Sequence, residues 1–202
     1  MGVSERKERD KLEMKQLIRA AAVKMFLQEG YAKTSIRNIA EEIEYSPGTI
    51  YLYYKDKDEL LYEVQRHAYS KLIDAFKAEA LSEDPLLKLR EVCNTYISFG
   101  IENPELYDLM FIIRAPMNVD ENVHKNNGKE AFDFLLDHLT VCVSQDLLRI
   151  NNVHECGLQI WATAHGLVSL NLRCRLKEVG SEESLPEMLK NTMQNYLTIL
   201  IR

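Results

Sequence analysis

The sequence predicts an all-α protein of about nine helices. Apolar residues recur three and four positions apart along most of its 202 residues, which is the spacing of one helical face. Only 8 glycines and 5 prolines occur, so helices joined by short turns are favoured over a sandwich or a barrel. No segment has the pattern of a β-hairpin, and no internal repeat is present.

Two helices are expected before residue 45. The first spans about 10–29, and Gly30 ends it as a helix C-cap. The second is short, about nine residues, and begins after either Thr34 or Ser35, because both hydroxyls can cap a helix N-terminus.

A third and a fourth helix follow closely. Ser46 caps the third, and Pro47 occupies its first position, where a missing N–H has no cost. This helix runs to about Tyr53. Asp56 then caps a longer amphipathic helix that reaches about residue 81.

The rest of the chain continues in the same manner. Further helices are predicted at about 84–99, 103–113, 129–149, 153–177 and 184–201. Ser184 and Glu187 have the spacing of a capping box at the start of the last one. Residues 114–128 are the least periodic stretch and are expected to form a loop, with a short turn of helix inside it as the alternative.

Charge is unevenly distributed. Residues 1–60 hold 11 basic and 11 acidic side chains; the totals of 25 and 31 therefore leave 14 basic and 20 acidic in residues 61–202. The whole net charge of −6 thus lies outside the first 60 residues. An acidic chain is poor evidence for nucleic-acid binding by itself, but a basic surface could still form locally.

The composition favours a cytoplasmic, non-enzymatic protein. The four cysteines lie far apart and predict free thiols in a reducing compartment, with a redox-sensing role as an alternative. No apolar run is long enough for a membrane helix. The five histidines form no metal-binding pattern, so no metal or cofactor is expected. The sequence has no phosphate-binding loop, no nucleophile elbow and no paired metal ligands, so no motif predicts an enzyme.

The stretch SPGTIYLYYKDKDEL at 46–60 predicts a helix-turn-helix. A recognition helix can be short and needs small residues where it approaches DNA, and Gly48 and Thr49 provide that closeness. Tyr51 and Tyr53 can face DNA, and Lys57 can reach a phosphate on the other wall of the groove. The alternative is that these tyrosines and lysines merely form a solvated helix end.

The order of residues across these helices resembles the DNA-binding domain of the tetracycline-repressor (TetR) family of transcriptional regulators. The segment AAVKMFLQEGYAKTSIRNIAEEIEYSPGTIYLYYKDKDELLYEV carries this resemblance over about 45 residues. It implies base or sugar-phosphate contacts from Thr49 and Tyr51, and phosphate contacts from Thr34, Tyr53 and Lys57. The full set of expected DNA-binding residues is Thr34, Ser35, Arg37, Ser46, Pro47, Gly48, Thr49, Tyr51, Tyr53, Lys55 and Lys57.

Three features qualify the resemblance. Tyr54 stands where the family usually has a packing Phe, so we expect it in the core. Leu52 replaces a residue that is often polar or aromatic in the family, which would narrow base readout. Glu41, Glu42 and Glu44 are tolerable only if their end of the second helix points away from DNA.

The remainder resembles the family's effector-binding and dimerisation domain, which sets expected domains at 1–56 and 57–202. Trp161, His165 and Gly166 match a subgroup with a Trp-x3-His-Gly pattern on the penultimate helix. In the family the last two long helices form a four-helix bundle between two subunits. The stripe expected at that interface is Leu185, Leu189, Met193, Tyr196, Leu197 and Leu200, with packing on the chain's own core as the alternative.

A ligand site is expected where apolar bulk and a few polar groups combine. The candidates are Tyr96, Met110, Phe111, Arg114, Trp161 and His165. His165 has a competing interpretation as a hydrogen-bonded core histidine.

The sequence thus favours a homodimeric repressor that leaves a pseudo-palindromic operator in duplex DNA when a small molecule binds. The alternatives are an adaptor that retains a non-specific helix-turn-helix, and a ligand-independent or activating regulator. The sequence does not identify the effector.

Overall fold

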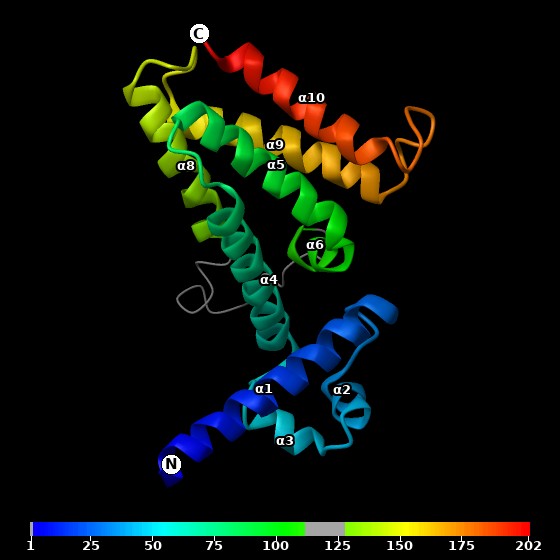
Figure 1. The fold of residues 1–202 in the computed structure, drawn as a ribbon. Helices are drawn as coiled ribbons and strands as arrows, with labels where there is room; N and C mark the ends of the chain where they lie inside the picture. The colour runs from blue at the N-terminus through cyan, green and yellow to red at the C-terminus, as the bar shows by residue number, and fades with distance from the viewer. Residues whose placement is uncertain (1, 112–127) are drawn as a thin grey trace. The chain divides into compact units, whose positions relative to one another are not determined.

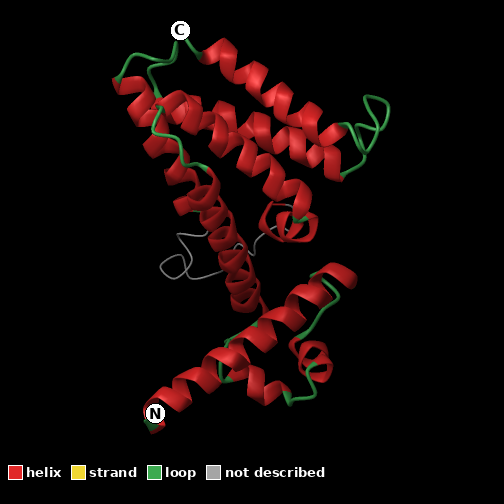
Figure 2. Ribbon diagram, viewed as in Figure 1, coloured by secondary structure: helices red, strands yellow, loops and turns green. Residues whose placement is uncertain are grey.

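The computed structural model describes residues 2–111 and 128–202. Within these two stretches the chain forms nine helices and no strands, which confirms the all-α prediction (Figures 1 and 2). The described residues divide into two compact units: residues 2–68 with 108–111, and residues 69–107 with 128–202.

The first unit is a three-helix domain completed by the start of a fourth helix. Its helices are α1 (Val3–Gln28), α2 (Ile36–Glu42), α3 (Pro47–Tyr51) and the first half of α4 (Lys57–Glu79). All four contribute fully buried side chains to one core, among them Ile18, Phe26, Ile39, Ile50 and Leu60. This core holds the short α3 in place, because five residues could not form a stable helix alone.

Local capping fixes where α2 and α3 begin. The hydroxyl of Ser35 accepts a hydrogen bond from the backbone N–H of Asn38 at 3.2 Å, so Ser35 rather than Thr34 is the cap. Ser46 caps α3 in the same way, accepting from the backbone of Thr49 at 3.2 Å. Between them the chain reverses through Glu44, whose φ of 59° is left-handed.

The second unit is built around α5. Its helices are the second half of α4, α5 (Pro85–Glu102), the start of α6 (Pro104–Phe111), α8 (Lys129–Ser144), α9 (Val153–Leu172) and α10 (Leu185–Leu200). α5 packs against α8, α9 and α10, and α9 also packs against α8 and α10 (Figure 1). Gly100 permits this packing, since a methyl group there would come within 2.5 Å of Val168 Cγ1.

Several predicted boundaries were wrong. α1 begins at Val3 instead of residue 10, and α8 and α9 end several residues early, followed by left-handed Asp146 and Cys174. The predicted capping box at Ser184 is absent, because the Ser184 hydroxyl bonds back to the carbonyl of Ser181 at 3.1 Å. The predicted 114–128 loop lies outside the described residues, except for Gly128.

No helix in the described part of the chain is sufficiently long and apolar to span a bilayer.

Candidate nucleic-acid interface and ligand site

The first turn of α3 presents small and polar groups to solvent. Gly48 and Ser46 are exposed, and the Ser46 and Thr49 hydroxyls lie 3.0 Å apart. Tyr51, the last residue of α3, is 55% exposed. Ile50, between Thr49 and Tyr51, is fully buried. Burial of Ile50 therefore fixes which face of the short helix looks outward.

Gly48 is not required by the fold. Its backbone is not left-handed, and among the described atoms a methyl group built on it would meet only Ser46 Oγ, at 3.6 Å, an ordinary contact. The N-terminus of a helix also offers unpaired N–H groups to an anion. The missing side chain thus gives an external partner room to approach the backbone.

Further predicted residues lie at the surface of the same unit. Arg37 is exposed and donates through Nε to Glu41 at 3.0 Å, and Lys55 is also exposed. Tyr53 is half-buried against the core. Tyr54 is 3% exposed, which confirms the expectation that it packs inside, and burial raises the pKa of its phenol to about 12.

Thr34, a predicted phosphate contact, is buried. Its side chain is 2% exposed, and its hydroxyl lies 3.0 Å from the carbonyl oxygen of Gly30 and 3.2 Å from that of Met25. Both carbonyls also accept a backbone N–H, from Glu29 and from Thr34 itself, so the hydroxyl adds a second hydrogen bond to each at the α1–α2 turn. The side chain therefore closes α1 and cannot reach a phosphate in this conformation.

Lys57 is also engaged inside the protein. Its ammonium donates to the backbone oxygens of Tyr31 at 2.7 Å and Thr34 at 2.9 Å, and lies 4.2 Å from the centre of the Tyr31 ring. The Tyr31 hydroxyl in turn donates to Asp58. Lys57 thus ties the first turn of α4 to the α1–α2 turn, which leaves one N–H for any outside partner.

Two exposed apolar residues flank the recognition helix. Tyr45, in the turn before α3, was not among the predicted contacts, and Leu52, just after α3, is 81% exposed. Tyr45 directly follows Glu44, whose backbone is left-handed, and no pattern in the sequence singled it out.

Three of the predicted ligand residues meet in the second unit. Trp161 Nε1 donates to the Tyr96 hydroxyl at 3.3 Å, and that hydroxyl lies 3.1 Å from the hydroxyl of Tyr107. The Tyr107 hydroxyl lies 2.6 Å from Nδ1 of His165, whose Nε2 is 3.2 Å from Ser169 Oγ. Sequence reasoning missed Tyr107, which is fully buried and links the others.

Burial sets the protonation state of this cluster. Desolvation lowers the pKa of His165 below its ordinary value of 6.5 and raises that of Tyr96. A neutral imidazole can accept a hydrogen bond from the Tyr107 hydroxyl at Nδ1 and donate one from Nε2 to the Ser169 hydroxyl. The observed distances fit that arrangement.

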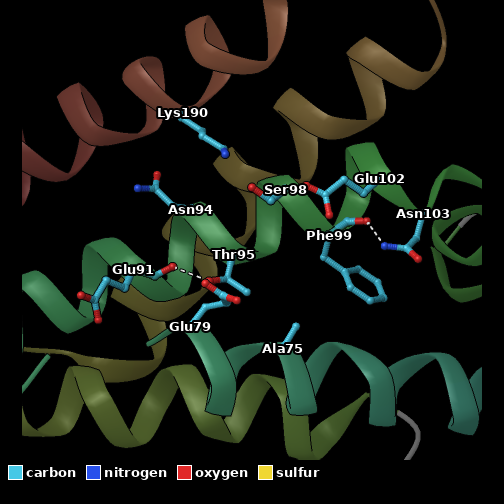
Figure 3. Close-up of a pocket in the computed structure, with 10 residues that line it drawn as sticks. All are labelled: Ala75, Glu79, Glu91, Asn94, Thr95, Ser98, Phe99, Glu102, Asn103 and Lys190. Atoms are coloured by element: carbon cyan, nitrogen blue, oxygen red, sulfur yellow. Dashed lines mark hydrogen bonds between the residues drawn. The ribbon is translucent and has the colours of Figure 1, made fainter. Parts of the chain in front are cut away.

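The other ligand candidates are not brought into this cluster. Met110 is buried and Phe111 half-buried in the first unit, and Arg114 lies outside the described residues. A separate open cleft of about 480 Å³ lies among α4, α5 and α10 (Figure 3). Its polar lining includes Glu79, Glu91 and Lys190 and none of the predicted ligand residues.

Most of the predicted dimer stripe packs within this chain, which was the alternative that the sequence left open. Leu185, Leu189, Met193, Leu197 and Leu200 are each at most 7% exposed, because this face of α10 packs on the chain's own core. They leave almost no surface for a partner. Only Tyr196 of the predicted set is half-exposed, and its hydroxyl donates to Gln159 at 3.3 Å.

Three of the four cysteines lie in the protein interior. Cys93, Cys142 and Cys156 are buried, and burial raises the pKa of each thiol, to about 12 for Cys93. Cys174 is exposed. Within residues 2–111 and 128–202, no group of three or more His, Cys, Asp or Glu is placed to hold a metal ion.

Two family models match the chain. Residues 18–64 match "Bacterial regulatory proteins, tetR family", and residues 89–193 match "Tetracyclin repressor-like, C-terminal domain". The first match spans α2 and α3, and the second spans α5 to α9 and half of α10.

Curated relatives are also regulators. HbdR of Aromatoleum sp. (strain CIB), an HTH-type transcriptional regulator, is 44% identical over 159 residues, which cover 76% of this chain and 68% of HbdR. AcrR of Shigella flexneri is 26% identical over 144 residues, 67% of each protein. The uncharacterized regulator YuxN of Bacillus subtilis is 39% identical over only 59 residues, and the chain spans 20% of its length.

Solved structures share the fold. The fatty acid degradation regulator FadR from Bacillus halodurans superposes with a TM-score of 0.73 at 18% identity, covering 91% of this chain and 94% of FadR. PfmR from Thermus thermophilus, a TetR family regulator, gives 0.69 at 20% identity, covering 90% and 97%. With the family models and the HbdR match, the chain belongs to the tetR family of bacterial regulatory proteins and is a DNA-binding transcriptional regulator.

Proposed function

We propose that the chain is a cytoplasmic, homodimeric repressor that binds a pseudo-palindromic operator and is released by a small molecule. Residues 1–56 would form the DNA-binding domain and 57–202 the ligand-binding and dimerisation domain. The observation that supports operator binding best is the outward face of α2 and α3, where Arg37, Thr49 and Tyr51 are accessible on a buried scaffold. The relatives are regulators rather than enzymes, so no catalytic role is proposed.

The roles of the interface residues follow from their surroundings. Thr49 and Tyr51 would contact bases or sugars, and the backbone at Gly48 would approach a phosphate. The accessible residues near this helix would contact further phosphates or sugars. Ser35, Arg37, Ser46, Tyr53 and Lys55 would do so through polar groups, and Pro47 through van der Waals contact. Thr34 and Lys57 would act by positioning the helices, since their polar groups already bind backbone carbonyls.

Operator binding is tested with an operator selected by the wild-type protein from a random-sequence duplex library. Fluorescence anisotropy should show binding that resists scrambled competitor DNA. A dimer that places two α3 helices in successive major grooves, about 34 Å apart, should lose tight binding when a few base pairs are inserted between the half-sites. Binding that scrambled DNA competes away equally well would favour the adaptor alternative.

The homodimer would use the outward face of α9 and α10. This face retains exposed apolar residues, with Leu158 at 56% and Ile199 at 67%, and Leu170 is exposed as well. Exposed apolar area of this kind marks interfaces. Sedimentation of the wild type should give a dimer, and Leu158→Glu with Ile199→Glu should give a folded monomer; a dimeric double variant would place the interface elsewhere.

The effector would bind beside the Tyr96–Tyr107–His165 cluster. The polar groups of this cluster lie in a largely apolar interior, as in small-molecule sites. Trp161 and His165 belong to one network through Tyr96 and Tyr107, which supports the proposed Trp-x3-His-Gly subgroup. Compounds are screened by release of the selected operator. A binder whose affinity is unchanged in Tyr107→Phe would place the effector site elsewhere.

Release would follow from a population shift. An effector that binds better to a conformer with the wrong spacing between recognition helices pulls the protein off DNA. α4 is the candidate lever, because its first turn is tied to the α1–α2 turn and its second half belongs to the other unit. Transcription in vitro from a promoter that carries the operator distinguishes repression from activation. Repression that persists with every compound tested would favour a ligand-independent regulator.

A further inference from the structure

The basic charge of the first 60 residues is concentrated in α1. Residues 1–28 contain seven basic and four acidic side chains, whereas residues 29–60 contain four basic and seven acidic ones. The segment that carries the recognition helix thus has a net charge of −3, and α1 has +3. Phosphate neutralisation supplies much of the affinity of a DNA-binding protein. Positive charge on a neighbouring element would therefore add to the affinity that this acidic segment can supply.

Three lysines of α1 share one face. Lys7, Lys11 and Lys15 are spaced four residues apart, so they form one row that rises about 6 Å at each step. The row continues into Ile18 and Ala22, which are buried against the recognition-helix core. The lysine stripe, defined as Lys7, Lys11 and Lys15, therefore projects from the side of α1 that faces α2 and α3.

Contacts at one end of the stripe fix this direction. Lys15 Nζ lies 5.7 Å from the ring centre of Tyr54, which is the third residue after the end of α3. Toward its N-terminus, α1 extends beyond α3 (Figure 1). Lys7 and Lys11 are exposed on this extension.

The arginines near the N-terminus of α1 form ion pairs within the helix. Arg6 lies 3.9 Å from Asp10, and Arg9 lies 3.6 Å from both Asp10 and Glu13, on another side of the helix. These ion pairs reduce the charge that the arginines offer to a partner. Within the described residues, Lys7 and Lys11 make no ion pair or hydrogen bond, so their ammonium groups remain available.

We propose that the lysine stripe of α1 is a second phosphate-binding surface, which contacts the DNA backbone flanking the base pairs that α3 reads. It would extend each half-site outward and supply the positive charge that residues 29–60 lack. The stripe carries no base-reading groups, so it adds affinity and salt dependence without sequence preference.

The test compares the wild type with Lys7→Gln/Lys11→Gln, because glutamine keeps the length and helix propensity of lysine without its charge. Both are titrated with the selected operator between 50 and 200 mM salt. Loss of two phosphate contacts should reduce the log–log salt slope by about 1.8 per protomer. The wild type should then lose roughly 12-fold more affinity per protomer than the variant over this range.

Two controls isolate the stripe. Lys71→Gln/Lys77→Gln removes the same charge from exposed positions of α4 in the other unit and should leave the slope unchanged. Lys7→Arg/Lys11→Arg retains the positive charge and should bind as the wild type does. When the operator duplex is shortened to the selected base pairs, the affinity of the wild type should fall and that of the glutamine variant should stay the same.

The outcomes are separable. If the wild type selects an operator but the glutamine variant has the same salt slope and the same response to trimming, the stripe does not contact DNA. If the wild type binds no duplex at all, the proposed function fails together with the stripe. If the variant loses binding to phosphatidylglycerol vesicles and keeps its DNA binding, the stripe is a membrane surface and this proposal is overturned.

Discussion

Replacing Gly48 by alanine separates the demands of folding from those of DNA binding. The nearest described atom to the added methyl group would be Ser46 Oγ at 3.6 Å, and the backbone of Gly48 is not left-handed. Alanine therefore fits the free protein without strain. Because glycine is less favourable than alanine in a helix by roughly 0.5–1 kcal/mol, Gly48→Ala should be neutral or slightly stabilising. At an exposed first turn we expect about 0.5 kcal/mol, or a rise in Tm of about 1–2 °C.

Binding should change in the opposite direction. The methyl group would stand at the point where the N-terminus of α3 approaches a phosphate, and would push the two apart. A hydrogen bond to a charged group contributes about 1.5–3 kcal/mol, so each half-site should weaken roughly 10- to 150-fold. Anisotropy with the selected operator measures the affinity, and thermal unfolding followed by circular dichroism measures the stability.

Gly100→Ala provides the reciprocal control. Its methyl group would lie 2.5 Å from Val168 Cγ1 and 3.1 Å from the Tyr107 ring, so it should destabilise the second unit by about 1–3 kcal/mol. Well below its Tm it should bind operator like the wild type. Unchanged operator affinity in Gly48→Ala would refute the close approach of α3 to DNA. A fall in the Tm of Gly48→Ala would refute the claim that the fold does not need a glycine at position 48.

Four further predictions follow from single contacts. Lys57→Met should lower the free energy of unfolding by about 1–2 kcal/mol in urea titrations, because two backbone carbonyls lose their donor; an unchanged midpoint would contradict this. Tyr54→Phe should be neutral or stabilising, because no described atom accepts or donates a hydrogen bond at the Tyr54 hydroxyl; a clear loss would reveal a missing partner. The lowered pKa of His165 means that the unfolded chain takes up a proton first, so stability should fall as the pH drops below about 6.5, and His165→Gln should flatten that dependence. In native protein a thiol reagent should modify Cys174 rapidly and the three buried cysteines only after denaturation; fast reaction of a second thiol would contradict the assigned burial.

Features set by neighbours in the sequence were predicted well. Ser46 and Pro47 start α3 as expected because the cap reaches only three residues along the chain. The buried face of α2 follows from the spacing of its isoleucines. Ser184 shows the limit of this reasoning: its spacing to Glu187 fits a capping box, but its backbone is helical and its hydroxyl turns back to Ser181.

Features set by distant partners were not predictable. The acceptors of Lys57 lie 23 and 26 residues earlier in the chain, and Tyr107 joins His165 across 58 residues. A regular apolar stripe such as that of α10 shows that a face is buried and not which surface buries it. Sequence periodicity therefore could not decide between packing on the chain's own core and packing on a second copy.

The position of Lys57 gives the first turn of α4 a mechanical role. Its two hydrogen bonds join α4 to the turn between α1 and α2, and Thr34 closes α1 at the same turn. A tilt of α4 would therefore either break these bonds or move the whole recognition domain with it. Movement of the whole domain breaks no hydrogen bonds. A tilt of α4 would therefore be expected to displace α3 together with the rest of the recognition domain. Under the proposed function, Lys57 would therefore affect operator binding through the placement of α3. Its loss should weaken release of the selected operator by the proposed effector even where phosphate contacts elsewhere are intact.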